Sequence, residues 1–237
     1  MLFLQSDRPL ALLIAGLIAL SIAIVVHELA HAGVAWLMGD STGIDQGKTR
    51  IRFTNPVTRT RQTLTFINPL AYVNLIGFLM FLFIGFGFLG QAPVNPGRMR
   101  NPRWGLTASV AAGPLSNLLV AVLAGIPWML GWLPASPFIG SDVLPSITEV
   151  GYYIIFWNAL LCFFNLIPLY PLDGWTIVLG LLPTDLAYTW ERYRTQSYYL
   201  FFILIIISVL RIPGLPSPLQ LLIGEPTSAL VRVLTGL

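Results

Sequence analysis

Long stretches without a single charged residue dominate this sequence. They cover residues 9–26, 62–97, 104–141, 150–172 and 195–210. A helix needs about 20 predominantly apolar residues to cross the hydrocarbon core of a bilayer. Only 10% of the 237 residues are charged, whereas a soluble domain usually carries about a quarter. The sequence therefore predicts an all-α polytopic membrane protein, embedded in the lipid bilayer.

The apolar runs predict about four transmembrane helices within one membrane domain that takes in the whole chain. We place these helices at about residues 9–38, 106–132, 146–168 and 198–212. Pro9 suits the first turn of the first helix, and Gly39 suits its C-cap. After residue 212 the sequence alternates apolar stretches with proline and glycine. We expect that tail to lie at the membrane interface.

Positive charges gather in two of the predicted connections. The side chains are Lys48, Arg50, Arg52, Arg59 and Arg61 in the first connection and Arg98, Arg100 and Arg103 in the second. Loops rich in lysine and arginine stay in the cytoplasm, so both connections are expected there. The connection around residues 134–149 carries only Asp142 and Glu149, which suits the opposite face. Without interleaved aromatic residues or a known motif, the basic loops do not predict a nucleic-acid partner.

Residues 48–66 predict a small β-hairpin near the cytoplasmic face. Threonines alternate there with basic or apolar residues on both sides of Asn55-Pro56. Alternation with period two on either side of a turn signal is typical of paired strands. A solvated basic loop is the alternative interpretation.

Two histidines and a glutamate lie near the end of the first predicted helix. His27-Glu28-Leu29-Ala30-His31 has the form H-E-x-x-H, and the i, i+4 spacing puts both imidazoles on one helical face. That arrangement suits one zinc ion, with Glu28 as the base that takes a proton from a metal-bound water. Ionisable groups inside a membrane helix cost about 2.5–3.5 kcal/mol each on insertion scales. Three of them within five residues therefore indicate a function rather than isolated structural histidines.

A third metal ligand must come from elsewhere in the chain. Catalytic zinc sites generally have three protein ligands and one open position. The chain has no further histidine, and its single cysteine, Cys162, is interpreted as a packing residue in an apolar helix. Asp173 is the candidate, because it follows a hydrophobic helix broken by Pro168 and Pro171 and broken backbone at membrane depth lines buried or wet sites. An aspartate that caps the next helix is the alternative.

The ligands must also meet at one depth in the membrane. The first helix carries its histidines near its cytoplasmic end, and the helix at 146–168 delivers Asp173 just beyond its own C-terminal end. The two helices must therefore run in the same direction. A full crossing by residues 70–90 would reverse the later helix, so we expect this glycine-interrupted segment to be re-entrant, with both arginine-bearing loops in the cytoplasm.

These residues resemble the site-2 protease family of intramembrane metalloproteases. The H-E-x-x-H of residues 27–31 and Leu172-Asp173-Gly174 are similar to its two zinc-binding motifs, in the same order. Residues 113–117 (Gly-Pro-Leu-Ser-Asn) are similar to the glycine-to-asparagine element on the helix between them, and residues 93–103 resemble a segment of compact prokaryotic members. The resemblance covers residues 10–180. Tyr170 departs from it, because many members have proline there, and the loops leave no room for a PDZ-like or nucleotide-sensing domain.

The resemblance implies one zinc ion per chain, held by His27, His31 and Asp173, with Glu28 as the catalytic base. It implies hydrolysis of peptide bonds in membrane-spanning proteins or peptides, at a site nearer the cytoplasmic face.

The resemblance also implies that Asn117, and with it Asn165, assists near the scissile carbonyl, where hydrogen-bond donors stabilise an oxyanion. Interhelical hydrogen bonding is the alternative for both amides. In this arrangement the catalytic core takes in residues 10–180, and residues 198–237 form the C-terminal helix and tail.

Two other kinds of protein fit the same residues. A catalytically silent membrane chaperone or binding protein could keep the site for structural zinc, although such a site has no need of Glu28. A metal transporter could use His27, His31 and Asp173 near the membrane midplane. Transporters usually show repeated helix units and further ionisable residues along a path, and this sequence shows neither.

Overall fold

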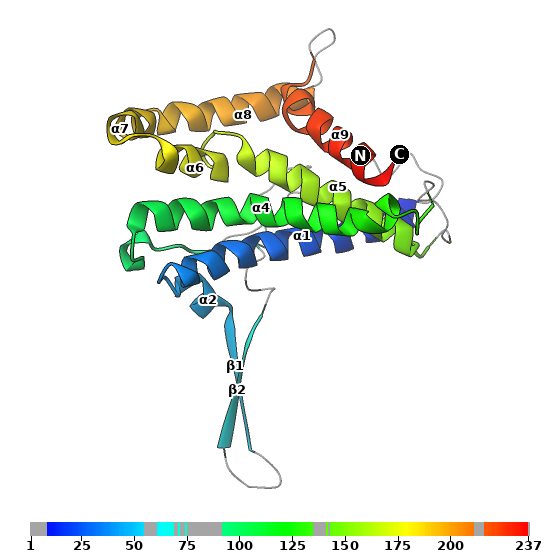
Figure 1. Ribbon diagram of the computed structural model, residues 1–237, viewed down its shortest axis with the longest axis horizontal. Coiled ribbons are helices and arrows are strands. Elements are labelled where there is room, and N and C mark those ends of the chain that lie inside the picture. Colours follow the sequence, from blue (N-terminus) through cyan, green and yellow to red (C-terminus); the bar gives the residue numbers. More distant parts are fainter. Residues whose placement is uncertain are drawn as a thin grey trace.

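Three long helices form the centre of the computed structural model, which describes residues 9–54, 61–68, 71, 74, 92–134, 141, 143–210 and 216–236. They are α1 (Pro9–Leu37), α4 (Pro102–Met129) and α5 (Ile147–Leu166), and each contacts the other two. Figure 1 shows α1 and α5 running in the same direction and α4 running between them in the opposite one. The parallel course of α1 and α5 is the one that a shared metal site requires.

These three helices are long and apolar enough to cross a membrane, at Leu10–Leu37, Pro102–Met129 and Ile147–Leu166. A fourth span within the described residues would combine α7 (Thr184–Arg192) with α8 (Arg194–Leu210), which are bent by 56° at the break between them. The chain is thus consistent with an integral membrane protein. The predicted fourth helix corresponds to α8, which begins four residues earlier than expected.

Side-chain caps fix where the second and third long helices begin. The Asn101 side chain accepts a hydrogen bond from the Trp104 amide, and Pro102 occupies the first turn. This start lies before the predicted one at residue 106, because Asn101 caps the helix and Pro102 suits its first turn. Ser146 and Glu149 form a reciprocal capping box at the start of α5, which satisfies two backbone donors at once.

A short helix and two strands follow α1. They are α2 (Thr42–Gly47), β1 (Lys48–Thr54) and β2 (Arg61–Ile67). The strands are antiparallel, with Lys48 opposite Ile67 and Thr54 opposite Arg61, and Figure 1 shows them projecting away from the helices. The predicted turn at Asn55-Pro56 and nearly all of the predicted re-entrant segment at 70–90 lie outside the described residues, so the re-entrant form stays a prediction.

The region after α5 contains more helices than the sequence predicted. It holds α6 (Asp173–Leu181), α7, α8, the π-helical η3 (Gln220–Gly224) and α9 (Glu225–Thr235). In the tail, Val231 and Leu234 of α9 pack with Trp128 of α4 and Ile155 of α5 in one hydrophobic cluster. The tail therefore covers the ends of α4 and α5 that lie away from α6.

Candidate metal centre

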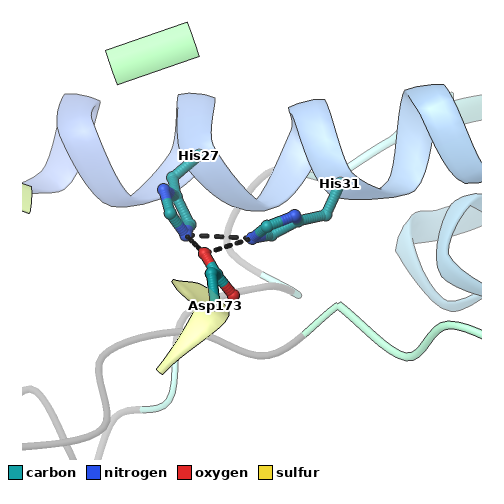
Figure 2. Close-up of side chains that lie close together, drawn as sticks. All are labelled: His27, His31 and Asp173. Atoms are coloured by element: carbon teal, nitrogen blue, oxygen red, sulfur yellow. Dashed lines mark hydrogen bonds and ion pairs between the residues drawn. The ribbon is translucent and has the colours of Figure 1, made fainter. Parts of the chain in front are cut away.

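His27, His31 and Asp173 converge in the interior of the helices. Figure 2 shows both imidazoles pointing from α1 toward the Asp173 carboxylate, at the start of α6. The Nε2 atoms of His27 and His31 lie 2.9 Å apart. The Asp173 Oδ2 atom lies 3.2 Å from Nε2 of His27 and 3.3 Å from Nε2 of His31. These three residues form a group that could hold one metal ion.

The far nitrogen of each imidazole contacts an oxygen atom that can only accept a hydrogen bond. Nδ1 of His27 lies 2.6 Å from Oδ1 of Asn117, and Nδ1 of His31 lies 2.8 Å from the Ser109 carbonyl oxygen. Nδ1 must therefore carry the proton in both rings, which leaves a lone pair on each Nε2. The two rings are thus held with their metal-binding nitrogens toward Asp173.

These protonation states leave three electron-rich atoms facing one another. Two unprotonated Nε2 atoms meet Oδ2 of Asp173, which is buried and accepts no hydrogen bond from the described residues. Buried polar atoms are normally satisfied, and an exception calls for an unseen ion or water. A cation at the meeting point satisfies all three atoms, and imidazole nitrogen with carboxylate oxygen is a donor set that zinc accepts. The residues therefore fit a zinc ion.

A glycine on α4 makes room for both imidazoles. A Cβ atom at Gly113 would lie 2.4 Å from Cε1 and Nε2 of His31 and 2.7 Å from Cε1 of His27. Pro114 follows directly inside the helix, and proline cannot donate the usual hydrogen bond to the preceding turn. The glycine predicted from the family resemblance thus lies directly against the two ligand side chains.

Asp173 is held at the first turn of α6 by contacts at both ends of that helix. Leu172 packs with Phe201 and Ile205 of α8, and a Cβ atom at Gly174 would lie 2.3 Å from the Ile167 carbonyl oxygen. At the other end, the Arg103 guanidinium donates to the carbonyls of Gly180 and Leu182. These contacts tie α6 to α4 and α8 and so fix the position of the carboxylate.

Glu28 directly follows His27 in α1. Its side chain is buried, and its Oε2 atom accepts a hydrogen bond of 2.6 Å from the Ala92 amide. A carboxylate has two oxygen atoms, and this contact engages one of them. Glu28 thus lies next to His27 in the chain but outside the three-residue group, and its role as a base stays a prediction.

Residues 92–100, which we call the strap, connect the neighbourhood of Glu28 to the end of α1. The Asn95 amide donates to Oδ2 of Asp40 over 2.6 Å, and the Arg100 amide donates to the Met38 carbonyl over 3.0 Å. Asp40 is fully buried and also accepts from the amide of Thr42. The strap is therefore attached to Glu28 in α1 and to Met38 and Asp40 directly after it.

The two asparagines expected near the scissile carbonyl lie in different surroundings. Asn117 is fully buried and contacts the side of His27 opposite Asp173. The Asn165 amide donates to the Leu161 carbonyl one turn earlier in its own helix. The described contacts match the interhelical alternative for Asn117, and those of Asn165 remain within α5.

Sequence reasoning did not single out Ser109, Asn158 or the Ala92 amide. Asn158 is fully buried and lies within hydrogen-bond distance of Asn117. A polar residue in an apolar membrane helix is itself a signal, and that signal could have identified Asn158. The Ser109 and Ala92 contacts use backbone atoms, for which the sequence carries no signal.

The fold and the site together define a helical protein with three candidate membrane spans and a group of two buried histidines and a half-buried aspartate that could hold a metal ion. No protein-family model matches the chain. The chain is 30% identical over 202 residues to a Bacillus subtilis (strain 168) protein named "Putative zinc metalloprotease YwhC", and the match covers 84% of this chain and 83% of the relative. The chain belongs to the same metalloprotease family as YwhC.

Proposed function

We propose that this chain is an intramembrane zinc metalloprotease of the site-2 type, which hydrolyses peptide bonds of membrane-spanning substrates. One observation carries the proposal: a His27–His31–Asp173 group that could hold a metal ion, with Oδ2 of Asp173 unsatisfied, lies among helices long and apolar enough to cross a membrane, and the buried Glu28 is the residue next to His27. A structural zinc site or a transport site has no need of that base.

The residues of the site have two roles in this proposal, metal binding and proton transfer. His27, His31 and Asp173 hold the zinc ion, which when bound supplies a Lewis acid for the scissile carbonyl and a water of lowered pKa. Glu28, fixed through one oxygen by the Ala92 amide, takes a proton from the attacking water and passes it to the leaving amine. The surrounding apolar helices exclude bulk water from these groups, which strengthens their electrostatic interactions.

The active site lies nearer the cytoplasmic face in this proposal. α1 ends and α4 begins at the same end of the helices, since the Arg100 amide bonds to the Met38 carbonyl. That end carries Arg98, Arg100 and Arg103, and lysine- and arginine-rich connections face the cytoplasm. His31 lies in the last two turns of α1, close to this end.

The strands β1 and β2 give the proposal a substrate-binding element. A helical substrate must unwind before hydrolysis, because its peptide bonds are engaged in its own hydrogen bonds. The two-stranded sheet has no further strand in the described residues, so each edge can accept an extended peptide by strand addition. Deletion of residues 48–66 should reduce cleavage of a helical substrate, and undiminished cleavage would count against this role.

The test is cleavage of a panel of single-span model substrates by purified, zinc-loaded protein in detergent. Wild type should cleave at least one of them, and Glu28→Gln and Asp173→Asn should not. Glu28→Gln should retain its zinc, since the change removes the base and no ligand, whereas Asp173→Asn should bind zinc more weakly. Cleavage by Glu28→Gln at the wild-type rate would overturn the proposal in favour of metal binding or transport.

A further inference from the structure

A chain of buried amide side chains connects His27 to the third long helix. Oδ1 of Asn117 lies 2.6 Å from Nδ1 of His27, and Nδ2 of Asn117 donates to Oδ1 of Asn158 over 2.8 Å. Nδ2 of Asn158 in turn donates to the Ile154 carbonyl over 2.8 Å. Both asparagines are fully buried, so water does not compete for these bonds.

Two backbone carbonyls determine which way both amides point. The Ile154 carbonyl can only accept, so it requires the amino group of Asn158 on its side and leaves the Asn158 oxygen facing Asn117. The Ala23 carbonyl accepts from Nδ2 of Asn117 over 3.0 Å, which requires the amino group of Asn117 to face α1 and α5. With both amino protons of Asn117 engaged, its oxygen is left for His27.

We propose that Asn158 is a positioning residue for the metal centre: through Asn117 it holds the proton of His27 on Nδ1 and so keeps Nε2 free to bind the ion. The described hydrogen bonds connect Asn158 to His27 only through Asn117. This inference rests on the proposed function in so far as His27 is a zinc ligand, but the hydrogen-bond chain itself exists without the ion.

The first arm of the test is zinc affinity, measured by competition with a chromophoric chelator. Second-layer partners of metal-ligating histidines typically contribute about 10- to 100-fold to metal affinity. Asn158→Leu should therefore weaken zinc binding by about 10-fold, the lower end of that range. Asn158→Asp keeps the oxygen that accepts from Asn117 and should bind zinc better than Asn158→Leu.

A double-mutant cycle separates the positioning role from a general loss of packing. In an Asn117→Leu background, the further change Asn158→Leu should alter zinc affinity by less than about two-fold, because the connection is already broken. If Asn158→Leu weakened binding by the same factor in both backgrounds, its effect would not pass through Asn117 and the proposal would be wrong.

The second arm detects the proton directly and needs no zinc. The chain has only two histidines, so 15N-labelled histidine in a protein with a histidine-free affinity tag gives four ring nitrogens. In zinc-free wild type at pH 8, Nδ1 of His27 should carry the proton, and in Asn158→Leu part of the population should shift it to Nε2. His31, whose Nδ1 bonds to the Ser109 carbonyl, is the internal control and should not change.

The two arms distinguish a failure of the proposed function from a failure of the role proposed for Asn158. A wild type that takes up no zinc would count against the proposed function, and the 15N measurement would still decide the role of Asn158. If Asn158→Leu left both the His27 nitrogens and the zinc affinity unchanged, the proposal would be overturned while the protease proposal stood. A variant that fails to fold would be replaced by Asn158→Ser, which fits any space that asparagine occupies and offers a shorter acceptor.

Discussion

At the scale of single residues, the site depends on a glycine, which has no side chain to displace the imidazoles. Both imidazoles of the candidate metal centre lie against Gly113, and no other residue could occupy that position without moving them. First-layer ligands must be held within about 0.5 Å of their productive geometry. The glycine is therefore as much a condition for metal binding as the histidines are.

Gly113→Ala should abolish tight zinc binding. Its Cβ atom would fall 2.4 Å from two atoms of the His31 ring, so at least one imidazole must turn away from Asp173. We expect a loss of zinc affinity of about 100-fold, the upper end of the effects seen when ligand support is removed. Chelator competition measures it.

Gly33→Ala is the matched control for this change. Gly33 lies in the same helix as the ligands, and a Cβ atom there would meet nothing within 4 Å. Alanine favours the helix by about 1 kcal/mol over glycine, so this variant should bind zinc as wild type does. Normal zinc binding by Gly113→Ala would show that the imidazoles can rearrange and would contradict the argument.

Sequence alone could identify the candidate ligands, but it could not identify the residues that hold them in place. His27 and His31 share one helix, and their spacing predicts a common face without any tertiary information. The contacts of Gly113, Ser109 and Asn158 are made between different helices. When nearly every position of a helix is apolar, its hydrophobic periodicity does not indicate which face packs against a neighbouring helix.

At the scale of elements, the position of α6 determines the position of Asp173, its first residue. Its far end fits closely against α4, where a Cβ atom at Gly180 would overlap the Thr107 hydroxyl. Gly180→Ala should therefore push α6 away from α4 and destabilise the protein by about 1–3 kcal/mol, as overpacking usually does. Thermal unfolding in detergent measures this effect.

A second variant ties that effect to the packing of α6. Thr107→Ala removes the hydroxyl that the new methyl group would meet, so Gly180→Ala should cost less in a Thr107→Ala background. An equal loss in both backgrounds would mean that the two helices do not meet as described.

The strap depends on the charge of Asp40, which gives it a pH dependence. Burial raises the pKa of this carboxyl, but hydrogen bonds from Thr42 and Asn95 outweigh burial and hold the pKa below its ordinary value. The unfolded value is about 3.9, so the stabilisation is fully present above that pH and is lost as the pH falls through the lower folded value.

Asp40→Asn should remove this stabilisation at neutral pH. The amide group of asparagine would place an N–H donor against one of the donors that now bond to the carboxylate. Hydrogen bonds to a charged group are worth about 1.5–3 kcal/mol. Wild type should therefore unfold at a higher temperature than the variant at pH 7, and the difference should shrink below about pH 4. A difference that stays constant down to pH 3 would exclude Asp40 as its source.

At the scale of the whole molecule, the course of the helices gives a testable orientation. The ends of α1 and α4 that meet at Met38 and Arg100 should face the cytoplasm, and the start of α5 should face the other side. In a Cys162→Ala background, a cysteine at Arg100 should react with an impermeant thiol reagent only from the cytoplasmic side. A cysteine at Leu144, which is exposed, should react only from the opposite side, and the reverse pattern would contradict the proposed orientation.

The three long helices were predictable because each is an apolar run with a distinct beginning. Pro9, Asn101 and Ser146 stand at or just before these beginnings, and the observed α1 and α5 match the predicted ranges within two residues. The region after Asp173 was not predictable to the same degree. Apart from α8, its helices are short, and they contact α4, α5 or α8; such contacts decide helix formation when a segment is too short to be stable alone.

The Glu28–Ala92 bond means that the proposed base and the candidate ligands are held by different parts of the chain. His27, His31 and Asp173 are held by α4 and by the attachments of α6, whereas the carboxylate of Glu28 is held by the strap. Under the proposed function, a disturbance confined to residues 92–100 should lower the rate of hydrolysis without releasing the ion. Metal content and turnover should then respond to different changes in the chain, so a fully metal-loaded preparation with a disturbed strap should be inactive.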